Sequence, residues 1–309
     1  MLERAAVRAV PRAVPKPWGR ADLSPWYPPD GKPGLVGEIW FERPAGPGPA
    51  SPASSLLLKL LFTSEPLSIQ VHPDDAYARS IGLPHGKAEA WYILTAGPQA
   101  VIALGLTDAI TPEALRGAVL DGSIADRVRW RRVSAGDAYY VAPGTIHSLG
   151  PGVVLLEVQQ RSDATFRLYD FGRHRTMHAD EAMAAASALQ DAPQQPRHRL
   201  DRERTVLVAS PHFVIELVEL PPATAWELNA MTETWVFTLG GRAKVGSVQA
   251  GTGDALTMDA SRTAIDVHDG PWKCLLAYIG STERPDLLQR RVPAERSLEQ
   301  QPQQPQAGA

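Results

Sequence analysis

The sequence is poor in cysteine and has no long hydrophobic run. Its single cysteine, Cys274, excludes an internal disulfide and a zinc site built from several thiolates. No apolar stretch approaches the roughly 20 residues that cross a bilayer. Charges and prolines interrupt the first residues before the apolar core of a secretion signal could form. We therefore expect a cytoplasmic protein without a membrane partner.

An excess of charge of one sign is also missing. The chain has 31 lysines and arginines against 34 aspartates and glutamates, and its formal net charge is -3. This balance gives no reason to expect nucleic acid as a partner. The 309 residues are 44% hydrophobic, enough to bury the cores of two domains or of one large one.

Short runs of β-forming residues separated by glycine and proline turns dominate the chain. They predict a mainly-β protein built from sandwiches or barrels. A helical insertion is expected at about residues 107–128, because Thr111 and Pro112 suit the start of a helix. An alanine-rich helix is expected to follow Asp180, before a polar linker at Gln194 and a second β-rich region.

The segment Leu67–Asp74 combines alternating aliphatic and polar residues. Because side chains alternate between the two faces of a strand, Gln70 and His72 are expected to point the same way. Glu89 opens a second β-forming run, and His147 follows a Pro-Gly turn after a third.

Together, Gln70, His72, Glu89 and His147 supply nitrogen and oxygen donors suited to a borderline divalent metal ion. A single histidine on a strand is more often a surface or hydrogen-bonded residue than a ligand. The two histidines and the glutamate alone would also match the two-His-one-carboxylate set of iron oxygenases, and Gln70 as a fourth donor argues against it.

Four segments carry a resemblance to a known family: Gln70-Val71-His72-Pro73, Gly86 to Leu94, Pro143 to His147, and Ser162 to Arg167. In this combination and order they resemble type I mannose-6-phosphate isomerases of the short bacterial kind, over roughly residues 16 to 280. There are departures: Ala88 stands where the family usually has Thr or Pro, and His85 lies two residues before Lys87 instead of next to it.

The resemblance implies two cupin-type jelly-roll barrels with a small helical insertion and an inter-barrel helix. It places a metal-binding domain at residues 1–190 and a metal-free cupin-like domain at 200–285. A disordered tail is expected at 286–309, where the chain becomes rich in glutamine and proline. The resemblance implies one zinc ion per chain, held by Gln70, His72, Glu89 and His147.

The expected reaction is the interconversion of mannose 6-phosphate and fructose 6-phosphate through an enediolate, so the partner is a hexose 6-phosphate. By motif match, the expected catalytic residues are Lys87, Asp163, Arg167 and Glu157. Lys87 would move protons if burial and the metal lower its pKa, or else form a salt bridge or contact phosphate. Asp163 is a candidate acid or base, Arg167 a candidate phosphate or oxyanion contact, and Glu157 a candidate ligand-orienting residue. Which residue is the general base stays open.

Two other functions stay open: a cupin Fe(II) dioxygenase, and a sugar-phosphate-binding protein without activity. The exact sugar, the pathway and the choice between a monomer and a homodimer are not determined by the sequence.

Overall fold

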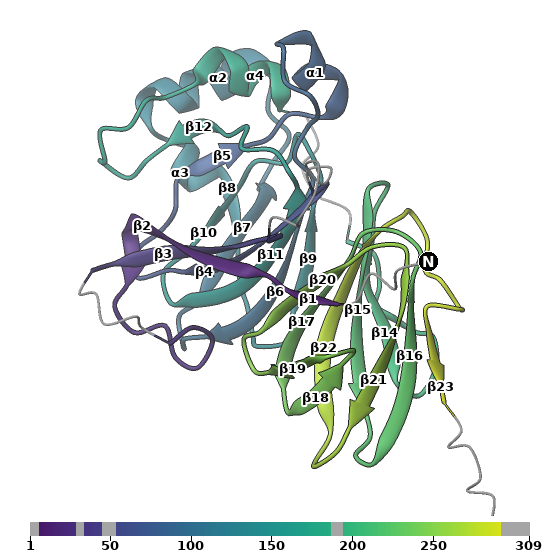
Figure 1. Cartoon of the computed structure of the whole chain (residues 1–309). Helices are drawn as coiled ribbons and strands as arrows, with labels where there is room; N and C mark the ends of the chain where they lie inside the picture. Colours follow the sequence, from purple (N-terminus) through teal and green to yellow (C-terminus); the bar gives the residue numbers. More distant parts are fainter. Residues whose placement is uncertain (1–5, 29–33, 45–53, 187–193, 292–309) are drawn as a thin grey trace, which may run out of the picture.

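The computed structural model describes residues 6–28, 34–44, 54–186 and 194–291. The mainly-β prediction is confirmed, because strands form four sheets in which every pairing is antiparallel. The strands fall into an N-terminal half and a C-terminal half that lie side by side (Figure 1). Each half contains two sheets that enclose a core, as expected for a jelly roll.

The N-terminal half is built from a five-stranded and a six-stranded sheet. The five-stranded sheet has the order β12 (Phe166–Tyr169), β5 (Ile69–Val71), β10 (His147–Leu149), β7 (Val101–Leu106) and β8 (Val128–Arg132). The six-stranded sheet has the order β2 (Val10–Arg20), β3 (Val36–Glu42), β4 (Leu56–Phe62), β11 (Val153–Gln160), β6 (Glu89–Ala96) and β9 (Ala138–Val141).

The C-terminal half is built from a seven-stranded and a second five-stranded sheet. The seven-stranded sheet has the order β1 (Val7–Arg8), β20 (Ala255–Met258), β17 (Thr234–Gly240), β22 (Trp272–Ile279), β15 (Phe213–Leu220), β14 (Arg204–Ala209) and β13 (His198–Arg199). The other has the order β19 (Val248–Gly251), β18 (Arg242–Val245), β21 (Ser261–Val267), β16 (Thr224–Ala230) and β23 (Leu288–Arg290).

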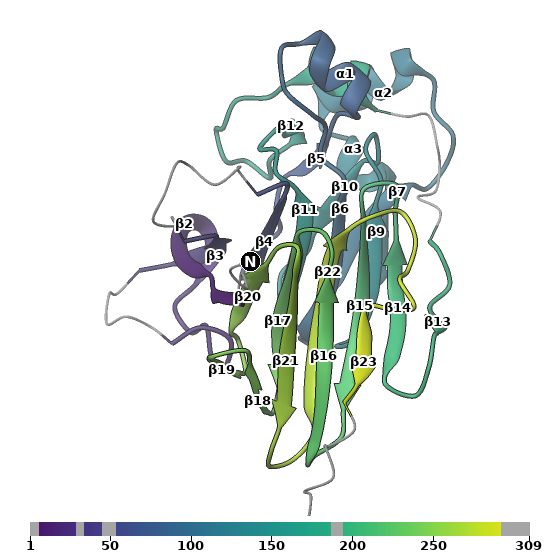
Figure 2. The same cartoon turned by 45° about the vertical axis from the view of Figure 1, so that its right-hand side comes forward.

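Four helices lie at one end of the N-terminal half: α1 (Asp75–Ser80), α2 (Pro112–Asp121), α3 (Ile124–Arg127) and α4 (Ala179–Ala185). In Figure 2, α1 and α2 again lie at the top of the molecule, away from the C-terminal strands. The side chain of Thr111 caps α2 by accepting a hydrogen bond from Ala114 N, as the sequence predicts. Helix α4 falls between the two β-rich regions in sequence, yet it packs with the other helices on the N-terminal half.

The layers are stacked through successive apolar cores. Helices α2 and α4 cover the outer face of the first five-stranded sheet, and a second core lies between the two N-terminal sheets. A third core joins the six-stranded sheet to the seven-stranded sheet of the other half. Strands β4 and β11 are therefore buried on both faces, which explains why they read as nearly continuous aliphatic runs instead of alternating ones.

Two segments cross the domain boundaries that the sequence suggests. Strand β1, near the N-terminus, pairs with β20 of the C-terminal half. The prediction of a disordered tail from residue 286 is wrong at its start, because β23 pairs with β16 and Leu287 and Leu288 are buried apolar residues. Residues 292–309 of that tail lie outside the described part of the chain. In the described residues, no helix has the length and apolar character needed to cross a bilayer.

Candidate metal centre and its cavity

Sheet register brings the predicted ligands together from distant parts of the chain. His147 on β10 is paired directly with Gln70 on β5, and His72 follows β5 immediately. Glu89 is the first residue of β6. The backbone N–H of Lys87 donates to Pro73 O at 3.0 Å and thereby joins the segment before Glu89 to the segment after His72. Gly86 is required at this approach, since an added Cβ would lie 2.5 Å from Pro73 O.

The donor atoms converge inside the N-terminal half. One ligating atom each from His72, Glu89 and His147 lies within 4.8 Å of the others, and all three side chains are buried. His72 Nε2 is 3.2 Å from Glu89 Oε1, and His147 Nε2 is 3.7 Å from Glu89 Oε2. Gln70 Nε2 is 3.3 Å from His147 Nε2. A half-turn of this amide exchanges its nitrogen and oxygen, so Gln70 is placed to offer Oε1 to the same point.

Backbone carbonyls fix the orientation of both imidazole rings. His72 Nδ1 donates to Ala164 O at 2.8 Å, and His147 Nδ1 donates to Thr145 O at 2.9 Å. In each neutral ring the proton on Nδ1 leaves the lone pair of Nε2 directed at Glu89. This arrangement is typical of histidines that ligate a metal.

The buried groups shift one another's pKa values. Burial, reinforced by the neighbouring His72, lowers the pKa of His147 to about 3. Burial and the ammonium of Lys87 also lower the pKa of His72. Burial opposes ionisation of Glu89, but Lys87 and His72 outweigh it and hold the pKa of Glu89 well below its usual value. The set is thus two neutral imidazoles and one carboxylate, the protonation states that metal binding needs.

Within the described part of the chain, Lys87 forms an ion pair with this carboxylate. Its Nζ is 2.8 Å from Glu89 Oε1 and 3.3 Å from His72 Nε2. Burial lowers the pKa of Lys87, but Glu89 and Glu157 outweigh that effect and raise it. Burial is therefore not enough to lower the pKa of Lys87, although proton transfer by this residue would need a lowered pKa.

The centre opens into a polar cavity of about 230 Å³. Its walls include Gln70, Lys87, His147 and the buried Glu157. Glu157 Oε2 accepts a hydrogen bond from Trp91 Nε1 at 3.3 Å. Its other oxygen faces Lys59 Nζ at 3.4 Å, in register across β4 and β11. Burial and the charge of Glu89 raise the pKa of Glu157 to about 7.

The other two predicted residues lie at the outer part of the cavity. Asp163 is exposed and lines the wall from the loop before β12. Arg167 is on β12, paired with Gln70, and donates from Nη1 to Thr176 O at 2.7 Å. The buried Nε of Arg167 has no hydrogen-bond partner.

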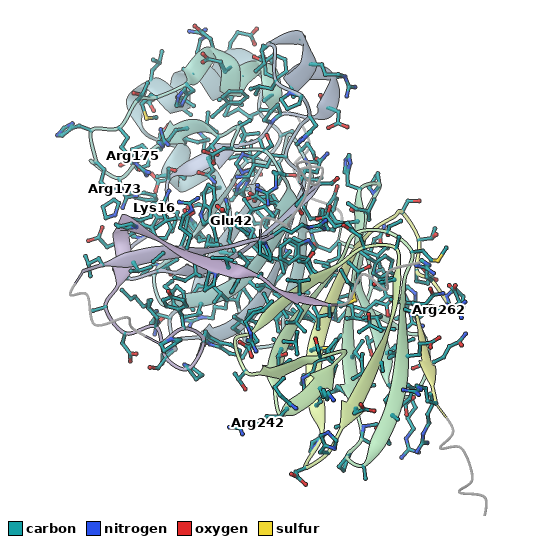
Figure 3. All side chains as sticks on the ribbon, in the orientation of Figure 1. Lys16, Glu42, Arg173, Arg175, Arg242 and Arg262 are labelled. Atoms are coloured by element: carbon teal, nitrogen blue, oxygen red, sulfur yellow. The ribbon has the colours of Figure 1, made fainter. Side chains whose placement is uncertain are left out.

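Three further cations reach this cavity that the sequence reasoning did not assign to it: Lys16, Lys59 and Arg175. Lys16 and Arg175 lie on the same edge of the molecule (Figure 3). The Nε of Arg175 donates to the buried Asp170 at 2.7 Å, and its side chain borders the cavity. The sequence does single out Lys59, because it is the one charged residue within the apolar run of β4.

The donor set fits a divalent metal ion. Both carboxylate oxygens of Glu89 are buried without an accepted hydrogen bond of good geometry. Lys87 compensates the charge at Oε1, whereas Oε2 faces the imidazole of His147 at 3.7 Å. A buried acceptor without a hydrogen bond is costly unless a cation compensates it. The Nε2 atoms of the two imidazoles complete a mixed nitrogen and oxygen set of borderline character.

The fold and the site together define a two-sandwich cupin-type protein with a candidate metal centre in its N-terminal half. No model of a known protein family matches the chain. In sequence it is similar to mannose-6-phosphate isomerases. The enzyme of Streptococcus mutans is 38% identical over 168 residues, 52% of this chain and 53% of that protein. An enzyme of Bacillus subtilis is 42% identical over 119 residues, 38% of each chain. The aligned part thus spans about half the length of these curated relatives, or less.

The structural comparison extends further along the chain. A crystal structure of the mannose 6-phosphate isomerase from Bacillus subtilis superposes with a TM-score of 0.75 and 25% identity, covering 89% of this chain and 100% of that one. A putative mannosephosphate isomerase from Archaeoglobus fulgidus gives 0.70 at 15% identity, covering 90% and 99%, a likeness of fold alone. Both sequence and fold therefore resemble mannose-6-phosphate isomerases.

Proposed function

We propose that the protein is a zinc-dependent mannose-6-phosphate isomerase that interconverts mannose 6-phosphate and fructose 6-phosphate. The observation that carries this proposal is the convergence of His72, Glu89 and His147 beside a cavity that His147 and five cationic side chains line. Metal ligands next to an excess of positive charge suit an anionic sugar phosphate. The named relatives support the choice of substrate.

Gln70, His72, Glu89 and His147 would hold the metal. Once bound, zinc supplies a Lewis acid that polarises the sugar oxygens where enediolate charge develops. Because Gln70 is neutral and only Glu89 is anionic, this ligand set leaves the centre with net positive charge. In the described residues, no second group of His, Cys, Asp and Glu has this geometry. We accordingly assign the metal to residues 1–190 and regard 200–285 as a metal-free domain.

Proton transfer between C1 and C2 needs a base and an acid at the same cavity. Four buried titratable groups line it without being proposed ligands: Glu38, Lys59, Lys87 and Glu157. We assign proton transfer to Lys87, which lies 2.8 Å from the ligand Glu89, and to Glu157. Glu157 is positioned by Trp91 and Lys59, and its pKa of about 7 lets it give or take a proton at neutral pH. Compensation of Glu89 by a metal would also remove the main effect that raises the pKa of Lys87.

The phosphate is assigned to the outer cations. Arg167 has a buried Nε–H without a partner, and Arg175 and Lys16 lie on the adjoining wall. A guanidinium matches phosphate oxygens with two parallel hydrogen bonds. Asp163 is exposed on the same wall, where it would contact sugar hydroxyls and reject a misplaced phosphate by repulsion.

The test is a coupled isomerase assay over several hexose and pentose phosphates, before and after treatment with a chelator. Turnover of mannose 6-phosphate that is lost with the metal and restored by Zn²⁺ is the expected result. Sugar-phosphate binding by calorimetry with no turnover would instead identify a binding protein. Oxygen consumption dependent on Fe(II) would identify a dioxygenase.

A further inference from the structure

A second cavity, of about 640 Å³, lies where the two halves of the molecule meet. Its lining comes from the start of β4, the loop before β6, the end of β11 and the turn between β14 and β15. The lining residues are Ser54, Ser55, Leu56, Pro84, His85, Gln160, Arg161, Pro211, His212 and Ile279. None of these residues lines the cavity beside the metal centre.

The charge of this second cavity has one sign. Arg161 and two histidines, His85 and His212, line it, and no carboxylate does. The Nε of Arg161 is buried without a hydrogen-bond partner, and within the described residues this guanidinium has no ion pair. An arginine held in this way at a cavity wall is a receptor for an anion such as phosphate.

Two carboxylates in the neighbourhood are already engaged by other donors. Asp75 Oδ1 accepts hydrogen bonds from Gly86 N at 2.8 Å and Gln160 Nε2 at 3.2 Å. Glu233 accepts from Ser55 N at 2.6 Å and from Trp235 Nε1 at 2.8 Å. Within the described residues, neither carboxylate forms an ion pair with Arg161, so an anion from solution is free to bind there.

Short segments connect this cavity to the catalytic one. Arg161 lines the second cavity, and Asp163, two residues later in the chain, lines the first. Likewise, His85 lines the second cavity, and Lys87, two residues later, lines the first. Ser162 Oγ donates to His85 O at 3.4 Å and thus ties the two segments to each other. A ligand that holds Arg161 and His85 would restrict the backbone that positions Asp163 and Lys87.

We propose that this cavity binds a small phosphate ester and that its occupation modulates catalysis in the neighbouring cavity. Arg161, His85 and His212 bind the phosphate. The apolar wall of Leu56, Pro211 and Ile279 packs against an organic ring. The ester is therefore expected to bind more tightly than inorganic phosphate. Binding is independent of the proposed isomerase activity, whereas the modulation rests on it.

Isothermal titration of the full chain with AMP and with inorganic phosphate tests the binding site. Arg161→Gln and His212→Gln are each expected to weaken AMP binding by about tenfold or more, because each removes a charge-assisted contact. Arg242→Gln is the matched control, since Arg242 lies on the far side of the C-terminal half (Figure 3) and lines neither of these two cavities. Its affinity should equal that of the wild type.

Two results would overturn the proposal. One is AMP affinity within twofold of wild type in both Arg161→Gln and His212→Gln. The other is AMP binding that Arg175→Gln abolishes and Arg161→Gln does not, because AMP would then occupy the catalytic cavity. Kinetics give a separate readout: AMP should change kcat for mannose 6-phosphate in the wild type and not in Arg161→Gln. If no isomerase activity exists, the titration still decides the binding site.

Discussion

The two halves of the molecule use one architecture for different interiors. Between the sheets of the C-terminal half, large apolar side chains such as Trp226, Trp272 and Leu276 fill the space. Between the sheets of the N-terminal half, the apolar core shares the interior with a polar cavity whose buried groups include Lys59, Lys87 and Glu157. The difference lies in how the buried charges are satisfied.

In the C-terminal half, a buried charge is fully paired. Arg204 and Glu216 form two hydrogen bonds of 2.8 Å, and Tyr278 donates to Glu216 at 2.6 Å. Arg204 also donates to Arg284 O at 2.7 Å and so fastens the segment before β23. In the N-terminal half, Glu89 keeps two acceptors without hydrogen bonds of good geometry. A fully paired network such as that of Arg204 and Glu216 stabilises a fold, whereas buried groups without partners, such as the oxygens of Glu89, indicate a site.

The largest effect is expected from removing a proposed ligand. His147→Ala should eliminate bound zinc and reduce turnover to below roughly one thousandth of wild type, because the remaining donors lose a first contact to the metal. Metal analysis of the purified protein and the coupled assay measure both. His198→Ala is the control, as His198 is an exposed residue of the C-terminal half. Full zinc content in His147→Ala would refute the ligand assignment.

A smaller effect on turnover is expected from Lys87→Met. The thioether keeps most of the side-chain volume and removes the ammonium, so the metal should remain while kcat falls by about 10²- to 10⁴-fold. Lys273→Met changes a half-exposed lysine of the other half and should leave kcat unchanged. Rates near wild type in Lys87→Met would remove this residue from the mechanism.

Glu216→Ala tests the opposite interior. It leaves the buried guanidinium of Arg204 without its partner and should lower the free energy of unfolding by about 3–5 kcal/mol, measured by urea denaturation. Zinc content and kcat of the folded fraction should stay at wild-type values. The exposed pair of Glu227 and Arg262 provides the control, because Glu227→Ala should cost at most about 0.5 kcal/mol. An equal cost in both variants would contradict this account of the C-terminal interior.

The sequence predicts the centre of the site better than its rim. Gln70 and His72 are recognisable because alternation places them on one face of a strand. Glu89 opens a β-forming run, His147 follows a Pro-Gly turn, and the family resemblance groups all four. Arg175 was not assigned to the cavity because its place depends on its hydrogen bond to Asp170, which lies in a loop whose path no periodicity encodes. The strand β23 was missed because only pairing with β16 orders a segment with so few apolar residues.

The smallest predicted effect is a pH dependence of the free energy of unfolding of the metal-free protein, prepared with a chelator. The folded-state pKa values of His72 and His147 lie below their unfolded values, so the unfolded chain takes up protons below about pH 6.5 that the folded chain does not. Glu157 acts in the opposite sense, since its folded pKa of about 7 lies above its unfolded value. Between pH 6.5 and 4.5 the contributions of His147 and Glu157 offset each other, so the lowered pKa of His72 leaves an excess of up to about one proton in the unfolded state.

The free energy of unfolding should therefore fall by up to about 1.4 kcal/mol per pH unit as the pH drops through this window. Urea denaturation at several pH values, in the presence of chelator, measures the slope. Glu157→Gln sharpens the test, because it removes the opposing proton and should steepen the slope by about 1.4 kcal/mol per pH unit. If the stability of the wild type instead rises on acidification, proton uptake by Glu157 in the folded state outweighs proton uptake by both imidazoles in the unfolded state. The repulsion between Glu89 and Glu157 would then decide the pH dependence of the N-terminal interior.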